Sequence, residues 1–253
     1  MKLTLKNIGK IGTASVEING ITVIAGENNT GKSTVGRALF AVFNSFCNVQ
    51  KQIENERVDS VENLLDRMYM NASARFARIA NTADVARTIV AHIDEYRQIE
   101  LPDMQKSIID LLSQYDDGKI ESFDENTIAE TVSRIKDVLN VSGIDFLKSV
   151  LERKLDAEFN EQVCNIFSGD DGEIQLQIKD KIITVSVENE GSVDIQNPGD
   201  VSLHTEVVYI DDPFVLDDPS MFYRRIPSAS TDHRYHLRKK LFWPDTEANV
   251  FDE

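Results

Sequence analysis

The chain has 253 residues, of which 41% are hydrophobic and 28% charged, and its formal net charge is −16. This composition is typical of a globular protein of one or two domains and excludes a disordered or collagen-like chain. No apolar run approaches the roughly 18 residues of a membrane span. Two distant cysteines, Cys47 and Cys164, form no metal or redox spacing and indicate a reduced, cytoplasmic protein. The acidic residues are concentrated in the middle of the chain, which disfavours a broad nucleic-acid surface there.

Residues 1–25 are predicted to form strands. Apolar residues alternate from Leu3 to Ile8, and Asn19-Gly20 is typical of a hairpin turn. The nearly continuous apolar run over residues 21–25 is typical of a strand buried on both faces. A glycine-rich loop follows, and the apolar spacing after it predicts a helix from about Lys32 to Asn48.

Residues 50–167 are predicted to be almost wholly helical, and their clearest helix covers residues 144–167. Alternation then predicts a hairpin with its turn at Asp180-Lys181. A further buried strand is predicted over residues 207–210, and a basic helix from about Asp232 to Leu241. The predicted organisation is a first lobe over 1–49, a helical insertion over 50–167, and a return to the first lobe over 168–253.

The segment with the clearest chemistry is Gly26-Glu27-Asn28-Asn29-Thr30-Gly31-Lys32-Ser33-Thr34, which matches the P-loop pattern of Gly, four residues, then Gly-Lys-Ser/Thr. Glycines at both ends let the backbone wrap a phosphate, and successive N–H groups with the helix N-terminus attract an anion. Lys32 is predicted to reach the β- and γ-phosphates, Ser33 to bind Mg²⁺, and Thr34 to help hold the α-phosphate. The predicted cofactors are therefore ATP and Mg²⁺. The predicted nucleotide-binding residues in this segment are Gly26, Asn28, Asn29, Thr30, Gly31, Lys32, Ser33 and Thr34.

Three segments, residues 1–11, 21–34 and 209–217, resemble an ABC-type ATPase head. The resemblance is to its amino-terminal half in the group of RecF, structural-maintenance-of-chromosomes and overcoming-lysogenisation-defect (OLD) proteins, including AAA-family ATPases of phage-defence operons. It implies an α/β fold, the N-terminal lobe of a P-loop NTPase with an inserted helical subdomain. It also implies that two heads enclose ATP, each P-loop facing a Ser-Gly-Gly signature loop of the other head.

The sequence departs from the full pattern of such heads. It has no Leu-Ser-Gly-Gly-Gln-like signature, and Ser168-Gly169 is better interpreted as an acidic turn that enters a hairpin. We therefore expect the chain to be an amino-terminal portion of a longer head. In the resemblance, Asp211 is the candidate Walker B metal ligand and Asp212 the candidate catalytic residue. The alternative is a core strand that ends in acidic turn residues.

Two further features have an ordinary interpretation beside the functional one. Gln196 is a candidate sensor of the γ-phosphate, although a lone glutamine in a loop is more often solvated. The basic stretch near the carboxyl end, from Arg224 to Lys240 with interleaved aromatic residues, could grip nucleic acid, but we favour a solvated helix face or an interface. His233 and His236 have no third ligand at suitable spacing, which disfavours a metal site.

The predicted function is a Mg·ATP-binding, ATP-hydrolysing subunit that acts in DNA repair or anti-phage defence. Hydrolysis is expected only when a signature motif is supplied by further sequence or by a partner. The alternative is a nucleotide-gated binding module without hydrolysis of its own that controls a partner nuclease or toxin. We expect a homodimer or an assembly with a second head and no membrane partner, and nucleic acid stays open. The loop alone also allows a small-molecule kinase, whereas the lack of an Asn-Lys-x-Asp motif disfavours a GTPase.

Overall fold

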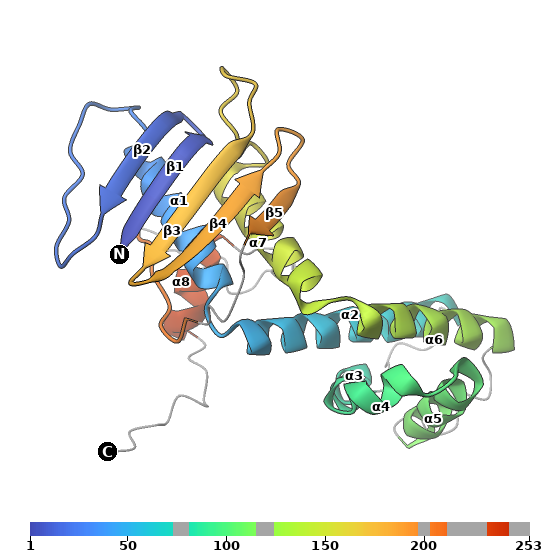
Figure 1. The fold of residues 1–253 in the computed structure, drawn as a ribbon. Helices are drawn as coiled ribbons and strands as arrows, with labels where there is room; N and C mark the ends of the chain where they lie inside the picture. The colour runs from blue at the N-terminus through green and yellow to red at the C-terminus, as the bar shows by residue number, and fades with distance from the viewer. Residues whose placement is uncertain (73–80, 115–123, 197–202, 212–231, 243–253) are drawn as a thin grey trace, which may run out of the picture. The chain divides into compact units, whose positions relative to one another are not determined.

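The computed structural model describes residues 1–72, 81–114, 124–196, 203–211 and 232–242 (Figure 1). Residues 1–49 and 147–253 form one compact unit, and residues 50–146 form a second. The second unit is shorter than the predicted insertion over 50–167. The difference arises because Leu147, Leu151 and Leu155 pack in the core of the first unit.

The first unit contains a five-stranded sheet with the order β2-β1-β3-β4-β5, in which each neighbouring pair is antiparallel. The strands are β1 (Lys2–Ile8), β2 (Ile11–Glu17), β3 (Gly172–Ile178), β4 (Lys181–Val187) and β5 (Val193–Gln196). Because side chains alternate between the two faces of a strand, residues such as Leu3, Ile174 and Val185 are buried on one face. The predicted mixed α/β class is confirmed. An antiparallel sheet is nevertheless atypical of a P-loop fold, so that finer assignment stays a prediction.

Two predicted strands are wrong. Residues 21–25 and 207–210 form no strand, and several of their apolar side chains are exposed: Ile21 is 95% exposed and Ile210 is 58% exposed. An apolar run is buried as a strand only where a neighbour pairs with it, and no described strand pairs with either segment. The predicted turn at Asn19-Gly20 also joins no strand pair. The hairpin turns earlier, at Gly9-Lys10, where Ile8 pairs with Ile11.

Helices α1 (Lys32–Ser45) and α7 (Gly143–Phe159) cover one face of the sheet (Figure 1). The structure confirms the start of α1 and the hairpin of β3 and β4. The helix predicted over residues 144–167 corresponds to α7, and its predicted end at Phe167 is wrong. The helix ends at Phe159 because Asn160 and Glu161 have φ values of 53° and 63°. Left-handed backbone at two successive residues ends a right-handed helix. The basic helix α8 (His233–Phe242) is present where the sequence predicts it.

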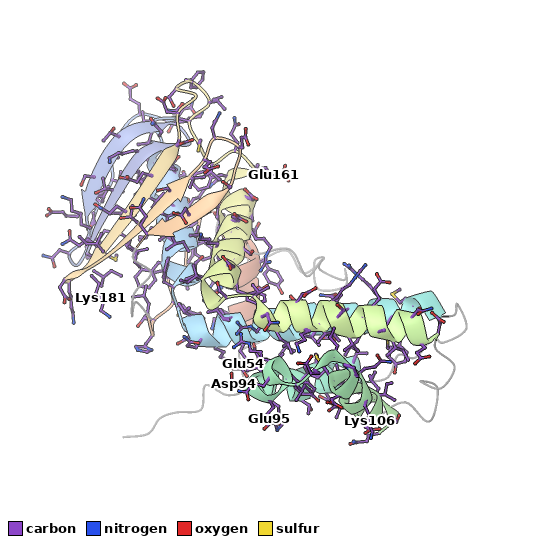
Figure 2. The ribbon with its side chains drawn as sticks, turned by 45° about the vertical axis from the view of Figure 1, so that its right-hand side comes forward. Glu54, Asp94, Glu95, Lys106, Glu161 and Lys181 are labelled. Atoms are coloured by element: carbon purple, nitrogen blue, oxygen red, sulfur yellow. The ribbon has the colours of Figure 1, made fainter. Side chains whose placement is uncertain are left out.

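The second unit is helical and has its own apolar core. Its helices are α2 (Val49–Ala72), α3 (Thr82–Ala91), α4 (Ile93–Gln98), α5 (Leu101–Ser113) and α6 (Glu125–Asn140). On α5 the buried residues Met104, Ile108 and Leu112 recur every four positions, as one helical face requires. Figure 2 shows Glu95 and Lys106 on the sides of α4 and α5 that point away from α2 and α6. Among the described residues, no helix is both long and apolar enough to cross a membrane.

Candidate functional site

The glycine-rich loop, residues 26–31, folds back on itself directly before α1. Lys32, the first residue of the helix, donates through Nζ to the Gly26 carbonyl oxygen at 2.8 Å and also to the Glu27 carbonyl. The Thr30 hydroxyl donates to the same Glu27 carbonyl at 2.9 Å. These bonds tie the end of the loop to its beginning, so the loop is closed by the contact of the Lys32 ammonium group with the first two loop carbonyls.

Gly31 connects the loop to the helix in a conformation that needs glycine. Its φ is +89°, and a Cβ atom there would lie 2.8 Å from Ile11 Cγ1. Among the described residues, no acceptor is bonded to the N–H groups of Gly31, Lys32 or Ser33. These donors point from the positive end of the helix and can hydrogen-bond an anion.

Sequence reasoning missed Lys10, which lies at the turn between β1 and β2. Its ammonium group donates to Oδ1 of Asn29 within the loop. The neighbouring Gly9, at φ +55°, also brings the turn close to α1, since a Cβ there would lie 3.2 Å from Thr34 Cγ2. The turn could have been found from the pairing of Ile8 with Ile11, but its contact with the loop is tertiary. Lys10 therefore brings a second ammonium group to the loop that Lys32 contacts.

The segment that carries Asp211 runs along α1. Asn44 brackets Val207, donating through Nδ2 to the Val207 carbonyl at 2.7 Å and accepting the Val207 N–H at 2.7 Å. Two turns earlier on α1, a Cβ at Gly36 would lie 2.7 Å from the Tyr209 ring. The segment therefore runs toward the N-terminal end of α1, where the glycine-rich loop lies. Asp211 follows Tyr209 by two residues, or about 7 Å of extended chain.

Asp211 is engaged by α8. Arg234 donates through Nη2 to Oδ2 at 2.8 Å and through Nε to Oδ1 at 3.3 Å. His233 Nε2 lies 3.0 Å from Oδ1, close enough for an ion pair although the ring N–H is not aligned for a hydrogen bond. The hydrogen bond from Arg234, with a smaller contribution from His233, lowers the pKa of Asp211 to about 2 against the opposing effect of burial. The carboxylate is thus ionised and already paired with the Arg234 guanidinium group.

His233 is anchored on a buried carboxylate. Glu158, whose side chain is 0% exposed, accepts the His233 main-chain N–H at 2.6 Å and faces Nδ1 at 2.7 Å. Burial raises the pKa of Glu158, and the hydrogen bonds and charge of His233 oppose that rise. The Tyr209 ring lies 4.6 Å from the imidazole and the Phe40 ring 6.1 Å from it, centroid to centroid. Glu158, His233, Asp211 and Arg234 are called the carboxylate–histidine cluster below.

The basic stretch of α8 is partly used within the chain. Lys240 Nζ lies 2.8 Å from Glu206 Oε2, and His236 Nε2 lies 3.6 Å from the same atom. With Arg234 on Asp211, α8 therefore pairs with two acidic residues of one segment. This pairing favours the interface interpretation of the basic stretch over a surface for nucleic acid.

The structure brings some predicted site residues together and separates others. Gly26, Asn29, Thr30, Gly31 and Lys32 share the contacts of the folded loop. Asn28 and Ser33 are exposed, and Thr34 caps the turn through its N–H to the Gly31 carbonyl at 3.0 Å.

The remaining predicted site residues lie elsewhere. Gln196 ends β5, at the opposite edge of the sheet from β2, about 19 Å away at the usual spacing of strands. Its amide donates to Ser186 Oγ at 3.4 Å. The predicted position of Gln196 in a loop beside the phosphates is therefore not supported. Asp212, the candidate catalytic residue, lies outside the described residues.

The residues present fit a phosphate better than a metal ion. Open N–H groups and two ammonium groups suit a polyphosphate. Of the two predicted Mg²⁺ ligands, the Ser33 hydroxyl is bonded to no described residue, whereas both oxygens of Asp211 accept hydrogen bonds from Arg234. Within the described part of the chain, no group of three or more His, Cys, Asp or Glu residues could hold a metal. The fit to Mg²⁺ is therefore partial.

Comparison with known proteins yields no match: no family model, no curated protein and no solved structure corresponds to the chain. The resemblance to ABC-type ATPase heads accordingly stays a prediction. The function is inferred from the loop, the carboxylate–histidine cluster and their contacts.

Proposed function

We propose that the chain binds the triphosphate of ATP at residues 26–34. The observation that carries the proposal is the closed loop, in which Lys32 reaches back to the Gly26 carbonyl while the N–H groups that open α1 stay without a protein acceptor. A glycine-rich turn that only connects two elements does not need Lys32 to fold back onto its first residues. In a loop that receives phosphate oxygens, this position lets the ammonium group and the N–H donors converge on one anion.

Each residue has a chemical role in this proposal. The N–H groups of Gly31, Lys32 and Ser33 hydrogen-bond phosphate oxygens, and Lys32 exchanges its carbonyl partners for phosphate charge. Lys10 stands beside Asn29 and adds positive charge at the rim. The exposed Ser33 hydroxyl is the residue that would hold Mg²⁺, an ion that neutralises phosphate charge when it is bound.

Of the two predicted outputs, a nucleotide-gated module without hydrolysis of its own is better supported for this chain. Asp211, the candidate metal ligand, is paired with Arg234 and His233, and the sequence has no signature loop. ATP hydrolysis is the second candidate, and it requires that a partner or further sequence complete the site. The resemblance to RecF- and OLD-type heads supports a second head and a nuclease or toxin as partners, in DNA repair or phage defence.

The test is isothermal titration of ATP with Mg²⁺ into wild-type protein and Lys32→Ala. We expect the variant to lose affinity by about 100-fold or more, because a charge-assisted contact at the centre of the site is removed. Lys181→Ala is the matched control, since Lys181 is an exposed lysine at the start of β4 (Figure 2) and should leave affinity unchanged. Equal affinity of wild type and Lys32→Ala would remove the proposal.

A further inference from the structure

The contact between α8 and Asp211 has a consequence for how the nucleotide site works. We infer that α8 is a latch: Arg234 and His233 occupy the Asp211 carboxylate, and α8 must release it before Asp211 can serve a cation bound with a nucleotide. This inference rests on the proposed function, because it concerns the same site. It assigns a role to α8 and to two residues outside the P-loop pattern.

The occupancy of the carboxylate is the first support. The planar guanidinium of Arg234 contacts both oxygens of Asp211, at 2.8 Å and 3.3 Å, and His233 Nε2 approaches Oδ1 at 3.0 Å. A divalent cation needs at least one of these oxygens and would be repelled by the guanidinium group beside it. Cation and Arg234 therefore compete for the same carboxylate.

The anchoring of α8 is the second support. His233, the first residue of α8, is fixed by its N–H and Nδ1 to the buried Glu158 at the end of α7. At the other end of the helix, Lys240 pairs with Glu206, which lies on the same segment as Asp211. Helix α8 thus contacts the segment from Glu206 to Asp211 at two points. Only the contact with Asp211 involves a candidate site residue.

The contact of the latch with α1 is the third support. The rings of His233 and His236 lie 6.1 Å and 5.4 Å from Phe40, which is buried on the helix that follows the phosphate loop. The segment held by α8 also runs beside Gly36 and Asn44 of the same helix. A change at the loop that moves α1 or Asp211 therefore acts directly on α8. Release of α8 is the event that a partner could detect.

The experiment measures α8 and the nucleotide separately. Hydrogen exchange of peptides from residues 233–242 is followed with no ligand, with a non-hydrolysable ATP analogue in EDTA, and with the analogue and Mg²⁺. We expect faster exchange only in the third sample. In parallel, analogue affinity is titrated with and without Mg²⁺ for wild type and Arg234→Ala. Removing the Arg234 guanidinium group should raise the Mg²⁺-dependent affinity for the analogue about five- to tenfold. It should also speed hydrogen exchange in α8 when no ligand is present.

Two further variants keep the test decisive. Arg134→Ala removes an arginine from an exposed ion pair with Glu130 on α6 and should change neither readout. Asp211→Asn should also loosen α8 but should gain no Mg²⁺-dependent affinity, because the carboxylate that would bind the cation is gone. Thermal unfolding checks that each variant folds, and Arg234→Lys, which keeps the charge but loses the two-point contact, replaces Arg234→Ala if that variant does not.

The outcomes separate the latch from the proposed function. Lower or unchanged Mg²⁺-dependent affinity in Arg234→Ala, while the wild type binds the analogue through Lys32, overturns the latch alone. Unchanged exchange in α8 on addition of analogue and Mg²⁺ does the same. A wild type that binds no analogue, or binds it equally well after Lys32→Ala, overturns the proposed function instead.

Discussion

The N-terminal end of α1 and the side of α1 differ in how many of their neighbouring polar groups are paired within the protein. At its N-terminal end, the loop leaves the N–H groups of Gly31, Lys32 and Ser33 without protein acceptors and exposes most of its residues. Along its side, the carboxylate–histidine cluster pairs almost every polar group and buries Glu158 completely. Donors left open at a helix end are available to a ligand, whereas polar groups that are paired with one another hold their own elements in place.

The difference teaches that a candidate nucleotide site can be half formed. In the proposed site, the loop that would receive phosphate is open, whereas the Asp211 carboxylate is engaged by α8. The two halves are joined by α1 and by the segment that runs beside it from Val207 to Asp211. A ligand bound at the loop can therefore affect the Asp211 carboxylate through α1. Substitutions at the loop and beside Asp211 should differ in their effects on ATP affinity and on stability.

The largest effect is expected at Gly31. Gly31→Ala places a side chain in the left-handed region and 2.8 Å from Ile11 Cγ1 in the apolar core. We expect a loss of about 2–4 kcal/mol in the free energy of unfolding, measured by urea denaturation. We also expect the loss of measurable ATP binding in a calorimetric titration. Gly12→Ala is the control, because a Cβ at Gly12 meets nothing within 4 Å. Equal stability of the two variants would mean that the loop is not seated on Ile11.

Asn44, on the side of α1, should have the next largest effect. Asn44→Ala removes two hydrogen bonds of 2.7 Å to Val207, and Asn44 is only 4% exposed. We expect a loss of about 1–3 kcal/mol in unfolding free energy, together with faster hydrogen exchange at residues 207–211. Asn63→Ala, which removes an exposed bond to the Asp59 carbonyl in α2, should cost much less. Protection of 207–211 that survives Asn44→Ala would show that Asn44 does not hold this segment.

Much of the fold was predictable because local patterns decide it. The alternation at Ile174, Leu176 and Val185 gives the β3–β4 hairpin, and the four-residue spacing of Leu147, Leu151 and Leu155 gives α7. Local sequence was misleading for residues 21–25 and 207–210, since a continuous apolar run states a preference for pairing but supplies no partner strand.

The candidate site also has a part that follows from local sequence and a part that depends on tertiary packing. The loop residues from Gly26 to Lys32 follow each other in sequence, so spacing alone could indicate them as a candidate phosphate-binding loop. Glu158, His233 and Asp211 come from three distant segments, and only the packing of α7, α8 and the extended segment brings them together. Lys10 was missed for the same reason, because its contact with Asn29 depends on how a hairpin turn meets a loop.

A pH titration isolates the ion pair on Asp211. Because its pKa is lowered from 3.8 to about 2 in the folded chain, the carboxylate stabilises the fold above about pH 4, and this contribution disappears as the pH falls to about 2. We expect wild type to be more stable than Asp211→Asn by about 1–2 kcal/mol at pH 5 after allowance for solvent screening. This gap in unfolding free energy should close by pH 2.

The sign of this titration distinguishes Asp211 from its neighbour Glu158. Burial raises the pKa of Glu158, so that group stabilises the fold most at low pH and loses this contribution as the pH rises. Wild type and Asp211→Asn both carry Glu158, so its contribution largely cancels in the difference between their unfolding free energies. A gap that is constant from pH 5 to pH 2 would contradict the ion pair between Asp211 and α8.

The smallest effect, and the sharpest test of the loop, concerns Lys10. Its ammonium group contacts Asn29 at an exposed position, so Lys10→Ala should leave the free energy of unfolding almost unchanged and weaken ATP binding about two- to fivefold. The loss should shrink as salt is raised, because an exposed charge is screened. Lys6→Ala is the matched control on the same hairpin, since Lys6 pairs with Glu173 on β3 and not with the loop. Equal effects of the two variants would show only a general charge effect, whereas a selective, salt-sensitive loss in Lys10→Ala would place the hairpin turn at the rim of the phosphate site.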